Sequence, residues 1–312
     1  MAASRKVRFV LVSRKTRLQE LTERFNTWPQ AKFYLEHAHV DAEDYLREHD
    51  VYVRQLLEAE RILKGQGRFQ LLERGFLPDY RFSPDDIVVV VGQDGLVANT
   101  LKYLSGQPVI GVNPDPQRWE GRLLPFVPAE LAEVVQRTLA GKTRCQSITF
   151  AEARTNDGQR LLGVNDLFIG PKSHTSARYA LQWHGQQEEQ SSSGIIVSTG
   201  FGSSGWFKSI LAGAVGVTRG VTGQESHPLA NGFDWQARKL YFTVREPFPS
   251  RTSGARLVFG AIEGEDCLRL ESHMPENGVV FSDGIESDYL NFNSGTILTV
   301  GVAADRGQLI VR

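Results

Sequence analysis

The sequence predicts two domains, an N-terminal parallel α/β domain followed by a C-terminal β-rich domain. A β-α-β pattern over residues 87–112 indicates the first, because an apolar β-branched run, a helical period and a second apolar run follow one another. Many short strand-like segments separated by Gly, Pro, Ser and Asn indicate the second. With 312 residues, 41% of them hydrophobic, the chain is long enough for two cores. We expect the boundary near Lys142, which gives domains at 1–142 and 143–312.

The charge and cysteine content exclude several classes of protein. The formal net charge is −1 at pH 7, so no overall basic field attracts nucleic acid or an anionic membrane. Cys145 and Cys267 lack CxxC spacing and indicate neither a disulfide framework nor a cysteine-rich zinc site. No apolar stretch approaches the length that spans a bilayer. We therefore expect a cytoplasmic protein without a nucleic-acid or membrane partner.

Strand-like and helix-like periods alternate along the first domain. Apolar β-branched runs indicate strands, and apolar residues three or four positions apart indicate helices. The helix that closes the domain has Pro near its start and Gly at its end, an arrangement common in helices. We expect strands at residues 6–13, 87–91 and 108–112, and helices at 16–25, 41–65, 96–106 and 128–141.

The second domain consists of short strand-like runs bounded by turn residues, which is typical of a β-sandwich. The polar stretch at 185–194 is expected to form a hairpin loop, and residues 206–214 a helix. Ser-Asp-Gly at 282–284 is interpreted as a hairpin turn. The strands are expected within residues 145–153, 161–169, 176–184, 194–199, 239–246, 256–262, 267–272, 278–284 and 295–303.

A glycine-bracketed acid, Gly-Gln-Asp-Gly at residues 92–95, directly follows the expected strand at 87–91. A glycine-rich turn between a parallel strand and a helix presents free backbone amides that suit a phosphate. Asp94 therefore has two open interpretations, a helix cap or a base beside a nucleotide phosphate. The chain has no G-x-x-x-x-G-K-[ST] loop and no G-x-G-x-x-G after a strand, which disfavours a P-loop kinase and an ordinary Rossmann dehydrogenase.

Two further segments place polar side chains beside predicted strands. Asn113 and Asp115 follow the strand at 108–112, at the edge where open α/β sheets bind ligands, although Asn-Pro and Asp-Pro also make simple turns. Asn165 and Asp166 are an adjacent polar pair in an apolar segment. Ligand contacts would satisfy this pair, or one of the two side chains is exposed, since neighbouring strand residues point to opposite faces.

A glycine turn rich in hydroxyl groups occupies residues 198–205, directly before Trp206. Hydroxyl groups and close backbone approach suit a ribose or a phosphate. The alternative is a Gly/Ser loop in which Ser204 caps the following helix and Trp206 packs in the core. The seven histidines show no H-x-x-x-H or H-E-x-x-H spacing, so no transition-metal site is expected.

Taken in order, the segments VVVVGQDGL, PVIGVNPDPQRWEG, GVNDLFIG, SSGIIVSTGFGSSGWF, TVREPF and VVFSDG resemble the NAD kinase family, in particular its mitochondrial-type branch. The resemblance extends from about residue 86 to the end. It implies a Rossmann-like α/β domain, a β-sandwich-like domain, and ATP-dependent phosphorylation of the adenosine ribose 2′-hydroxyl of NAD to give NADP. It also implies that Mg²⁺ accompanies ATP and that the protein forms a homodimer or a higher homo-oligomer.

The resemblance assigns a role to each residue of the glycine loop. Asp94 matches the family's base at the reacting hydroxyl, and Gly92 and Gly95 match glycines that approach the phosphates. Gln93 belongs to the same nucleotide-binding loop, where it replaces the family's second glycine. A side chain at this position is expected to restrict φ or to crowd the phosphates. Leu96 replaces a threonine.

The resemblance also implies contacts from the second domain. Asn165 and Asp166 match the family's Asn-Glu pair, which contacts the adenosine part and the ribose hydroxyls. Ser204 matches a position expected to contact adenine, and Asp283 matches an Asp-Gly with a structural role. The other residues predicted to bind nucleotide are Asn113, Ser198, Thr199 and Ser203.

Two other functions stay open. One is a kinase of the same superfamily that phosphorylates another hydroxyl acceptor, since diacylglycerol kinases and phosphofructokinases share the glycine loop. The segments beyond Asn165 favour NAD as the acceptor, because those kinases do not share them. The other is a non-catalytic nucleotide-binding regulator in which Gln93 blocks ATP.

Overall fold

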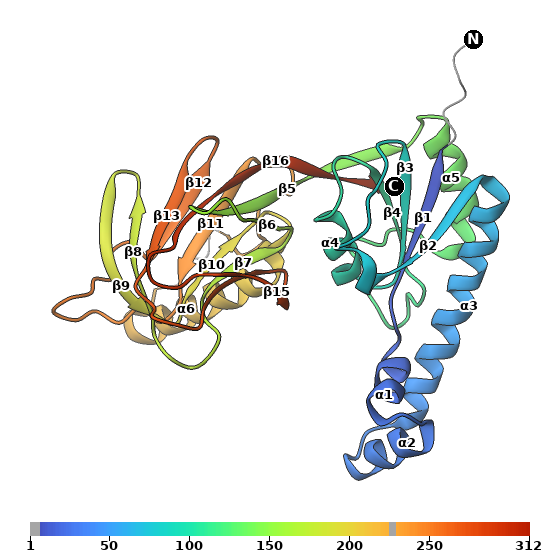
Figure 1. The fold of residues 1–312 in the computed structure, drawn as a ribbon, viewed down its shortest axis with the longest axis horizontal. Coiled ribbons are helices and arrows are strands. Elements are labelled where there is room, and N and C mark those ends of the chain that lie inside the picture. The colour runs from blue at the N-terminus through green and yellow to red at the C-terminus, as the bar shows by residue number, and fades with distance from the viewer. Residues whose placement is uncertain (1–6, 225–228) are drawn as a thin grey trace. The chain divides into compact units, whose positions relative to one another are not determined.

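The computed structural model describes residues 7–224 and 229–312 of the chain (Figure 1). The chain divides into two compact units, Met1–Gln146 with Gln308–Arg312, and Ser147–Gly307. The sequence placed all of residues 143–312 in the second domain, whereas the structure groups the last five residues with the first unit. The reason is that the end of β16 (Ile297–Val311) pairs with β4 (Pro108–Val112), a long-range contact without a local sequence pattern.

The first unit is built on a parallel sheet with the strand order β2-β1-β3-β4 followed by the end of β16. β1 (Arg8–Ser13), β3 (Asp86–Val91) and β4 match the predicted strands, and β3 is buried along its whole length. β2 (Arg68–Glu73) was not predicted, because half of its residues are exposed and only Leu72 is buried, so it lacks a run of buried apolar residues. Because β1, β3 and β4 are parallel, their carboxyl ends lie at the same edge of the sheet.

Helices connect these strands, namely α1 (Arg17–Phe25), α2 (Trp28–His37), α3 (Ala42–Gln66), α4 (Asp94–Leu101) and α5 (Leu131–Leu139). Thr16 caps α1 in a capping box with Gln19, and the Asp41 side chain caps α3. α1 and α2 gather near the start of α3 (Figure 1). α4 ends five residues before the predicted Gly106, in hydrogen-bonded turns that involve Tyr103 and Leu104.

The second unit is a β-sandwich. One sheet has the order β12-β11-β10-β7-β14-β15, and the other contains β16-β13-β8-β9, with β5 pairing β16 and β6. Leu and Ile side chains from both sheets, such as Ile169 and Leu270, form one buried cluster. The strands are β5 (Arg144–Thr155), β6 (Arg160–Gly163), β7 (Asp166–Pro171), β8 (Ala177–Trp183), β9 (Gln186–Ser192), β10 (Ile195–Ser198), β11 (Lys239–Val244), β12 (Phe259–Glu263), β13 (Cys267–Ser272), β14 (Gly278–Ser282) and β15 (Ile285–Asn291).

The predicted loop at 185–194 is wrong, because most of it forms β9, which pairs with β8. Alternate polar side chains of β9 are buried and satisfied. Glu188 accepts hydrogen bonds from the backbone amides of Arg256 and Leu257, and Gln190 accepts one from the Tyr179 hydroxyl at 3.0 Å. Composition alone suggested a solvated loop, whereas these partners, distant in sequence, stabilise a polar strand.

The outer face of the six-stranded sheet carries α6 (Trp206–Thr222). Its Gly205 N-cap makes no side-chain hydrogen bond, so the interpretation of Ser204 as a helix cap is wrong. Phe207 is the buried residue of this helix, while apolar residues such as Val217 and Val221 are exposed. Among the described residues, no helix is long and apolar enough to cross a membrane.

Candidate active site

The glycine loop at residues 92–95 lies at the carboxyl end of β3, directly before α4. The first helical hydrogen bond runs from the amide of Leu96 to the carbonyl of Gln93 at 2.9 Å, so the preceding amides lie outside the helical ladder. A Cβ atom at Gly95 would meet no atom within 4 Å, so space is open above this amide. A helix amino terminus with free amides and open space suits a phosphate group.

Asp94 is not the cap of α4, because Gln93 occupies the N-cap position. The Asp94 carboxylate instead accepts hydrogen bonds from the backbone amides of Leu123 at 2.7 Å and Arg122 at 3.3 Å. Both amides belong to the loop after β4. Asp94 is half-buried at the edge of the sheet, and the sequence interpretation as a simple cap is wrong.

Gln93 adopts φ −118° and ψ 163°, an extended conformation that any residue takes without strain. The expectation that a side chain at this position restricts φ is therefore wrong. The Gln93 side chain is half-buried and makes no capping hydrogen bond.

Asn113 organises the loop that approaches Asp94. Its side-chain amide donates to the Trp119 carbonyl at 2.9 Å, and its side-chain oxygen accepts from the Asp115 amide at 3.0 Å. Gly121 packs against it with φ +65°, and a Cβ atom there would lie 2.5 Å from Asn113 Nδ2. The polar side-chain atoms of Asn113 are thus engaged within residues 113–121.

A cluster of charged side chains anchors this loop to α3. The sequence did not indicate this cluster. Arg118 donates to both carboxylate oxygens of Asp44, with its Nη1 at 2.9 Å from Oδ2. Arg17 joins Asp44 to Glu48, and Arg14 donates to Glu48 at 2.7 Å. Hydrogen bonds from Arg118 and Arg17 hold the pKa of Asp44 well below its ordinary value. Burial acts to raise the pKa of Glu48, but the hydrogen bonds from Arg14 and Arg17 outweigh this effect, so the pKa of Glu48 is lowered.

Asp44→Asn should lower the free energy of unfolding by about 1 kcal/mol at neutral pH, a modest value because both partners are partly exposed. Because the folded pKa of Asp44 is depressed, its stabilisation is present above the unfolded value of 3.8 and is lost as the pH falls. Urea unfolding at neutral and acidic pH measures the difference, with Asp50→Asn on the same helix as the exposed control. Equal stability of the two variants at neutral pH would contradict the anchoring role.

In the second unit, Asp283 holds the turn that precedes β7. Its carboxylate accepts hydrogen bonds from the backbone amides of Val164 at 3.0 Å, Asn165 at 2.6 Å and Asp166 at 3.4 Å. Asp283 itself has φ +57° and is followed by Gly284 at φ +71°, in the tight connection between β14 and β15. The predicted hairpin turn at 282–284 is confirmed, and Asp283 also shapes the backbone around Asn165 and Asp166.

Asp166 has a buried carboxyl group that makes no hydrogen bond with the described residues. Burial, together with the nearby Asp283 carboxylate, raises the pKa of Asp166 to about 7. The neighbouring Asn165 is half-buried, and its side-chain amide has no partner in the described part of the chain. Buried polar groups normally have partners, so these two side chains are suited to a ligand.

The turn rich in hydroxyl groups packs directly on residues 163–166. Thr199 donates to the Val164 carbonyl at 2.5 Å, and a Cβ atom at Gly202 would lie 1.9 Å from the Asn165 carbonyl oxygen. Ser203 donates to the Gly200 carbonyl at 2.6 Å. Thr199 and Ser203 are therefore used inside the turn, as is Ser198, which donates to the Thr199 carbonyl.

Ser204 differs from the other hydroxyl residues of this turn. It is exposed, and its hydroxyl has no hydrogen-bond partner among the described residues. The structure thus gathers Asn165, Asp166 and Ser204 in two touching turns of the second unit. The polar groups of these three residues remain available to a ligand.

Metal-binding side chains do not cluster. Among the described residues, no group of three His, Cys, Asp or Glu residues is placed to hold a metal ion. Cys145 and Cys267 are exposed free thiols. Magnesium is commonly bound through substrate phosphates, waters and one or two carboxylates, so the loop at 92–95 fits magnesium that arrives with a nucleotide and not a dedicated protein cage.

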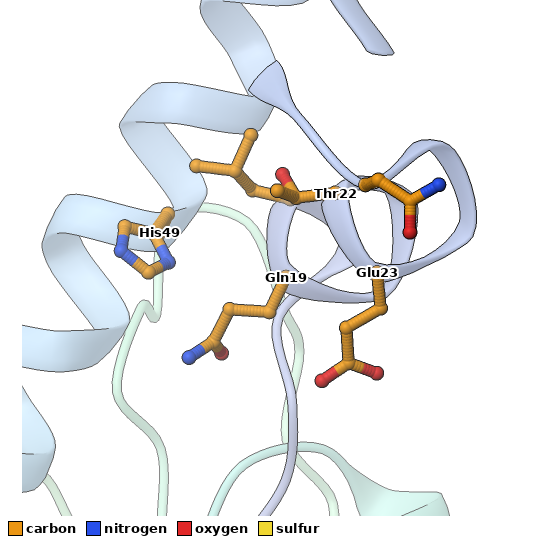
Figure 2. A pocket seen from close by; sticks show the side chains of 6 residues that line it. Gln19, Thr22, Glu23 and His49 are labelled. Atoms are coloured by element: carbon orange, nitrogen blue, oxygen red, sulfur yellow. The ribbon is translucent and has the colours of Figure 1, made fainter. Parts of the chain in front are cut away.

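A pocket of about 580 Å³ lies between α1 and α3, away from the glycine loop in sequence. Figure 2 shows Gln19, Glu23 and His49 around it. These polar side chains already have partners, because Gln19 and His49 contact Thr16 and Glu23 pairs with Lys15. The engaged polar groups of Gln19, Glu23 and His49 therefore do not mark the pocket as a substrate site.

Comparison with known proteins identifies the fold. No protein-family model matches the sequence, and no curated protein is significantly similar to it. A yeast NADH kinase complexed with NADH is similar in structure, with a TM-score of 0.60 and 13% identity over 99% of this chain and 84% of that one. The chain has the NAD kinase fold. An NAD kinase from Archaeoglobus fulgidus in complex with ATP matches with a TM-score of 0.55 and 14% identity, over 98% of this chain and 93% of that one.

The NAD kinase fold confirms the predicted fold class, a parallel α/β domain combined with a β-sandwich-like domain. Both similar structures match nearly the whole chain. At this level of identity the comparison concerns the fold, and the chemistry rests on the residues of the glycine loop and of the two turns.

Proposed function

We propose that this protein is an NAD kinase that phosphorylates the 2′-hydroxyl of the adenosine ribose of NAD with ATP, which gives NADP and ADP. The main support is Asp94, an acid at a helix amino terminus with free amides, in a chain with the NAD kinase fold. The ribose 2′-oxygen attacks the γ-phosphorus, and the bond from this phosphorus to the β–γ bridging oxygen breaks. Asp94 takes the hydroxyl proton.

The proposal gives the glycine loop the task of holding phosphate. The amides of Gln93 and Gly95 lie at the positive end of α4, where an anion is stabilised. The Gly92 amide donates to the Val112 carbonyl at 3.3 Å, so Gly92 has the proposed role of letting the backbone approach the phosphates closely. Magnesium bound to ATP would neutralise phosphate charge during transfer. Asn113 acts indirectly, by shaping the loop whose amides bind the Asp94 carboxylate.

In the second unit, we propose that Asn165 and Asp166 contact the adenosine part of the substrate and its ribose hydroxyls. Ser204 offers a free hydroxyl to the adenine. Ser198, Thr199 and Ser203 were predicted to bind nucleotide, and their hydrogen bonds within the turn support a positioning role. A homo-oligomeric state and a cytoplasmic location remain part of this proposal, the former supported by the exposed apolar residues of α6.

The direct test is NADP formation by the purified protein with NAD, ATP and magnesium. Parallel reactions with polyphosphate as the donor and NADH as the acceptor define both substrates. Turnover with NAD and ATP supports the proposal. Absence of NADP under all these conditions, with NAD still bound, would favour a different acceptor or a non-catalytic regulator.

One observation keeps the non-catalytic regulator as the second candidate. The half-buried Gln93 side chain stands in the phosphate-binding loop without a capping hydrogen bond, so it is able to occupy phosphate space. If Gln93 blocks ATP, Gln93→Gly should create or raise NADP formation. If Gln93 is compatible with ATP, the rate of NADP formation by Gln93→Gly should stay within about threefold of the parent rate. ATP binding measured by calorimetry on both proteins separates a donor-binding effect from an effect on transfer.

A further inference from the structure

The stretch between Asn113 and Leu123 belongs to the candidate active site, because the amides at its end bind the Asp94 carboxylate. The fold fixes both ends of this stretch. Asn113 and Leu123 are buried, and a Cβ atom at Gly111 would lie 2.0 Å from the Leu123 carbonyl oxygen, so Leu123 packs tightly against β4. Burial therefore holds the Leu123 amide in place.

The middle of the stretch has little buried surface. Residues 116, 117, 120 and 122 are all exposed. The Arg122 amide nevertheless donates to Asp94, at 3.3 Å, compared with 2.7 Å for the Leu123 amide. Because burial does not hold Arg122, the direction of its amide needs another support.

Arg118 supplies this support from within the stretch. Its guanidinium binds both Asp44 carboxylate oxygens, with Nη1 at 2.9 Å from Oδ2 and Nη2 at 2.5 Å from Oδ1. A bidentate pair of this kind fixes geometry as well as charge. The Arg118 and Asp44 side chains are only 23% and 32% exposed, so water screens their pair less than it screens a fully exposed pair. Asp44 lies in the first turn of α3, where Arg17 also holds it at 2.8 Å.

We propose that Arg118 is a positioning residue for Asp94, and that it acts by holding the backbone that leads to the Arg122 amide. The inference rests on the proposed role of Asp94 as the base, although the positioning itself belongs to the free protein. When Arg118 no longer grips α3, the Arg122 amide moves and the Asp94 carboxylate loses one of its two backbone contacts. Small displacements of a catalytic group are costly in rate.

The first test measures amide hydrogen exchange at Arg122 and Leu123 by NMR, on the full chain without nucleotide. Arg118→Met should speed exchange at Arg122 by about tenfold, because it removes a charge-assisted pair, and change Leu123 less, because burial holds that residue. Arg118→Lys keeps the charge and should recover most of the protection. Arg17→Met is the matched control, since it takes another cation from Asp44 but has no printed contact with the stretch, and both amides should exchange as in the parent.

The second test is steady-state NADP formation by the same variants. Arg118→Met should lower kcat by about tenfold and leave the KM for NAD unchanged, whereas Arg118→Lys should recover most of the rate. Asp44→Asn should add no further loss of kcat in the Arg118→Met background, because the two residues act as one pair. Arg17→Met should lose stability and keep the parent kcat, which separates positioning of Asp94 from a purely structural role.

Urea unfolding establishes that each variant is folded. Should Arg118→Met fail to fold, Arg118→Lys and Asp44→Asn decide the matter, because both alter the same pair. The proposal is overturned if exchange at Arg122 is unchanged in the variants of the pair, if faster exchange leaves kcat unchanged, or if Arg17→Met loses as much kcat as Arg118→Met. A parent that forms no NADP contradicts the proposed kinase function instead, and the exchange measurement still shows whether Arg118 holds the Arg122 amide.

Discussion

Asp94→Asn should lower the rate of NADP formation by about 10²- to 10⁴-fold, the usual contribution of a positioned general base, while NAD binding changes little. The substitution removes the proton acceptor and keeps the size of the side chain. The asparagine oxygen is still able to accept the Leu123 amide, so the loop after β4 should keep its position. The measurement is steady-state kinetics with saturating NAD, ATP and magnesium.

The control for this variant is Asp50→Asn, the same chemical change at an exposed position of α3, which should behave like the parent. A structural role for Asp94 makes a different prediction. If the carboxylate only holds the amides of Arg122 and Leu123, Asp94→Asn should destabilise the first unit and raise KM together with a small loss of kcat. A fall in kcat of less than about tenfold with intact folding would exclude Asp94 as the base.

Asp166→Asn should make the second unit more stable at alkaline pH, by roughly 2–4 kcal/mol at about pH 8. The pKa of Asp166 is raised from 3.8 to about 7 by burial and by the Asp283 carboxylate. A carboxyl group with a raised folded pKa contributes its full stability below the unfolded value of 3.8, and this contribution is lost as the pH rises through about 7. Asparagine is always neutral, so it avoids the cost of burying a charge.

Urea unfolding across this pH range measures the effect, with far-ultraviolet circular dichroism as the signal. The two proteins should be nearly equal in stability at about pH 4 and diverge up to about pH 8. Glu265→Gln, an exposed acid of the same unit, is the control and should show no such divergence. A destabilised Asp166→Asn at about pH 8 would mean that the native structure favours the ionised carboxylate.

The same substitution should weaken NAD binding if Asp166 contacts the ribose hydroxyls. A carboxyl group that destabilises the free protein and makes no hydrogen bond within the described chain has the properties of a residue kept for a ligand. Stability gained together with lost affinity would therefore support the proposed role of Asp166. Stability gained with unchanged affinity would leave the substrate contact to Asn165 and Ser204.

The local sequence determined the elements and the residue types of the candidate site. The β-branched run before Gly92 and the helical period after it predict β3 and α4, because each pattern is complete within about ten residues. The adjacent polar pair Asn165 and Asp166 is likewise recognisable from a short stretch of sequence, because the residues around it are apolar. The resemblance to the NAD kinase family joined these separate segments into one expected fold, and the structural comparison confirms that fold.

Only the tertiary structure decided what these residues touch. Asp94 binds amides 28 and 29 positions further along the chain, Arg118 is paired with Asp44 across 74 positions, and Asp283 holds a turn 117 to 119 positions before it. β9 was interpreted as a loop because its polar residues find their partners on other segments. The hydrophobic periodicity of a segment predicts which of its residues are buried. Hydrogen bonds and charge pairs between distant segments depend instead on how the chain folds back on itself.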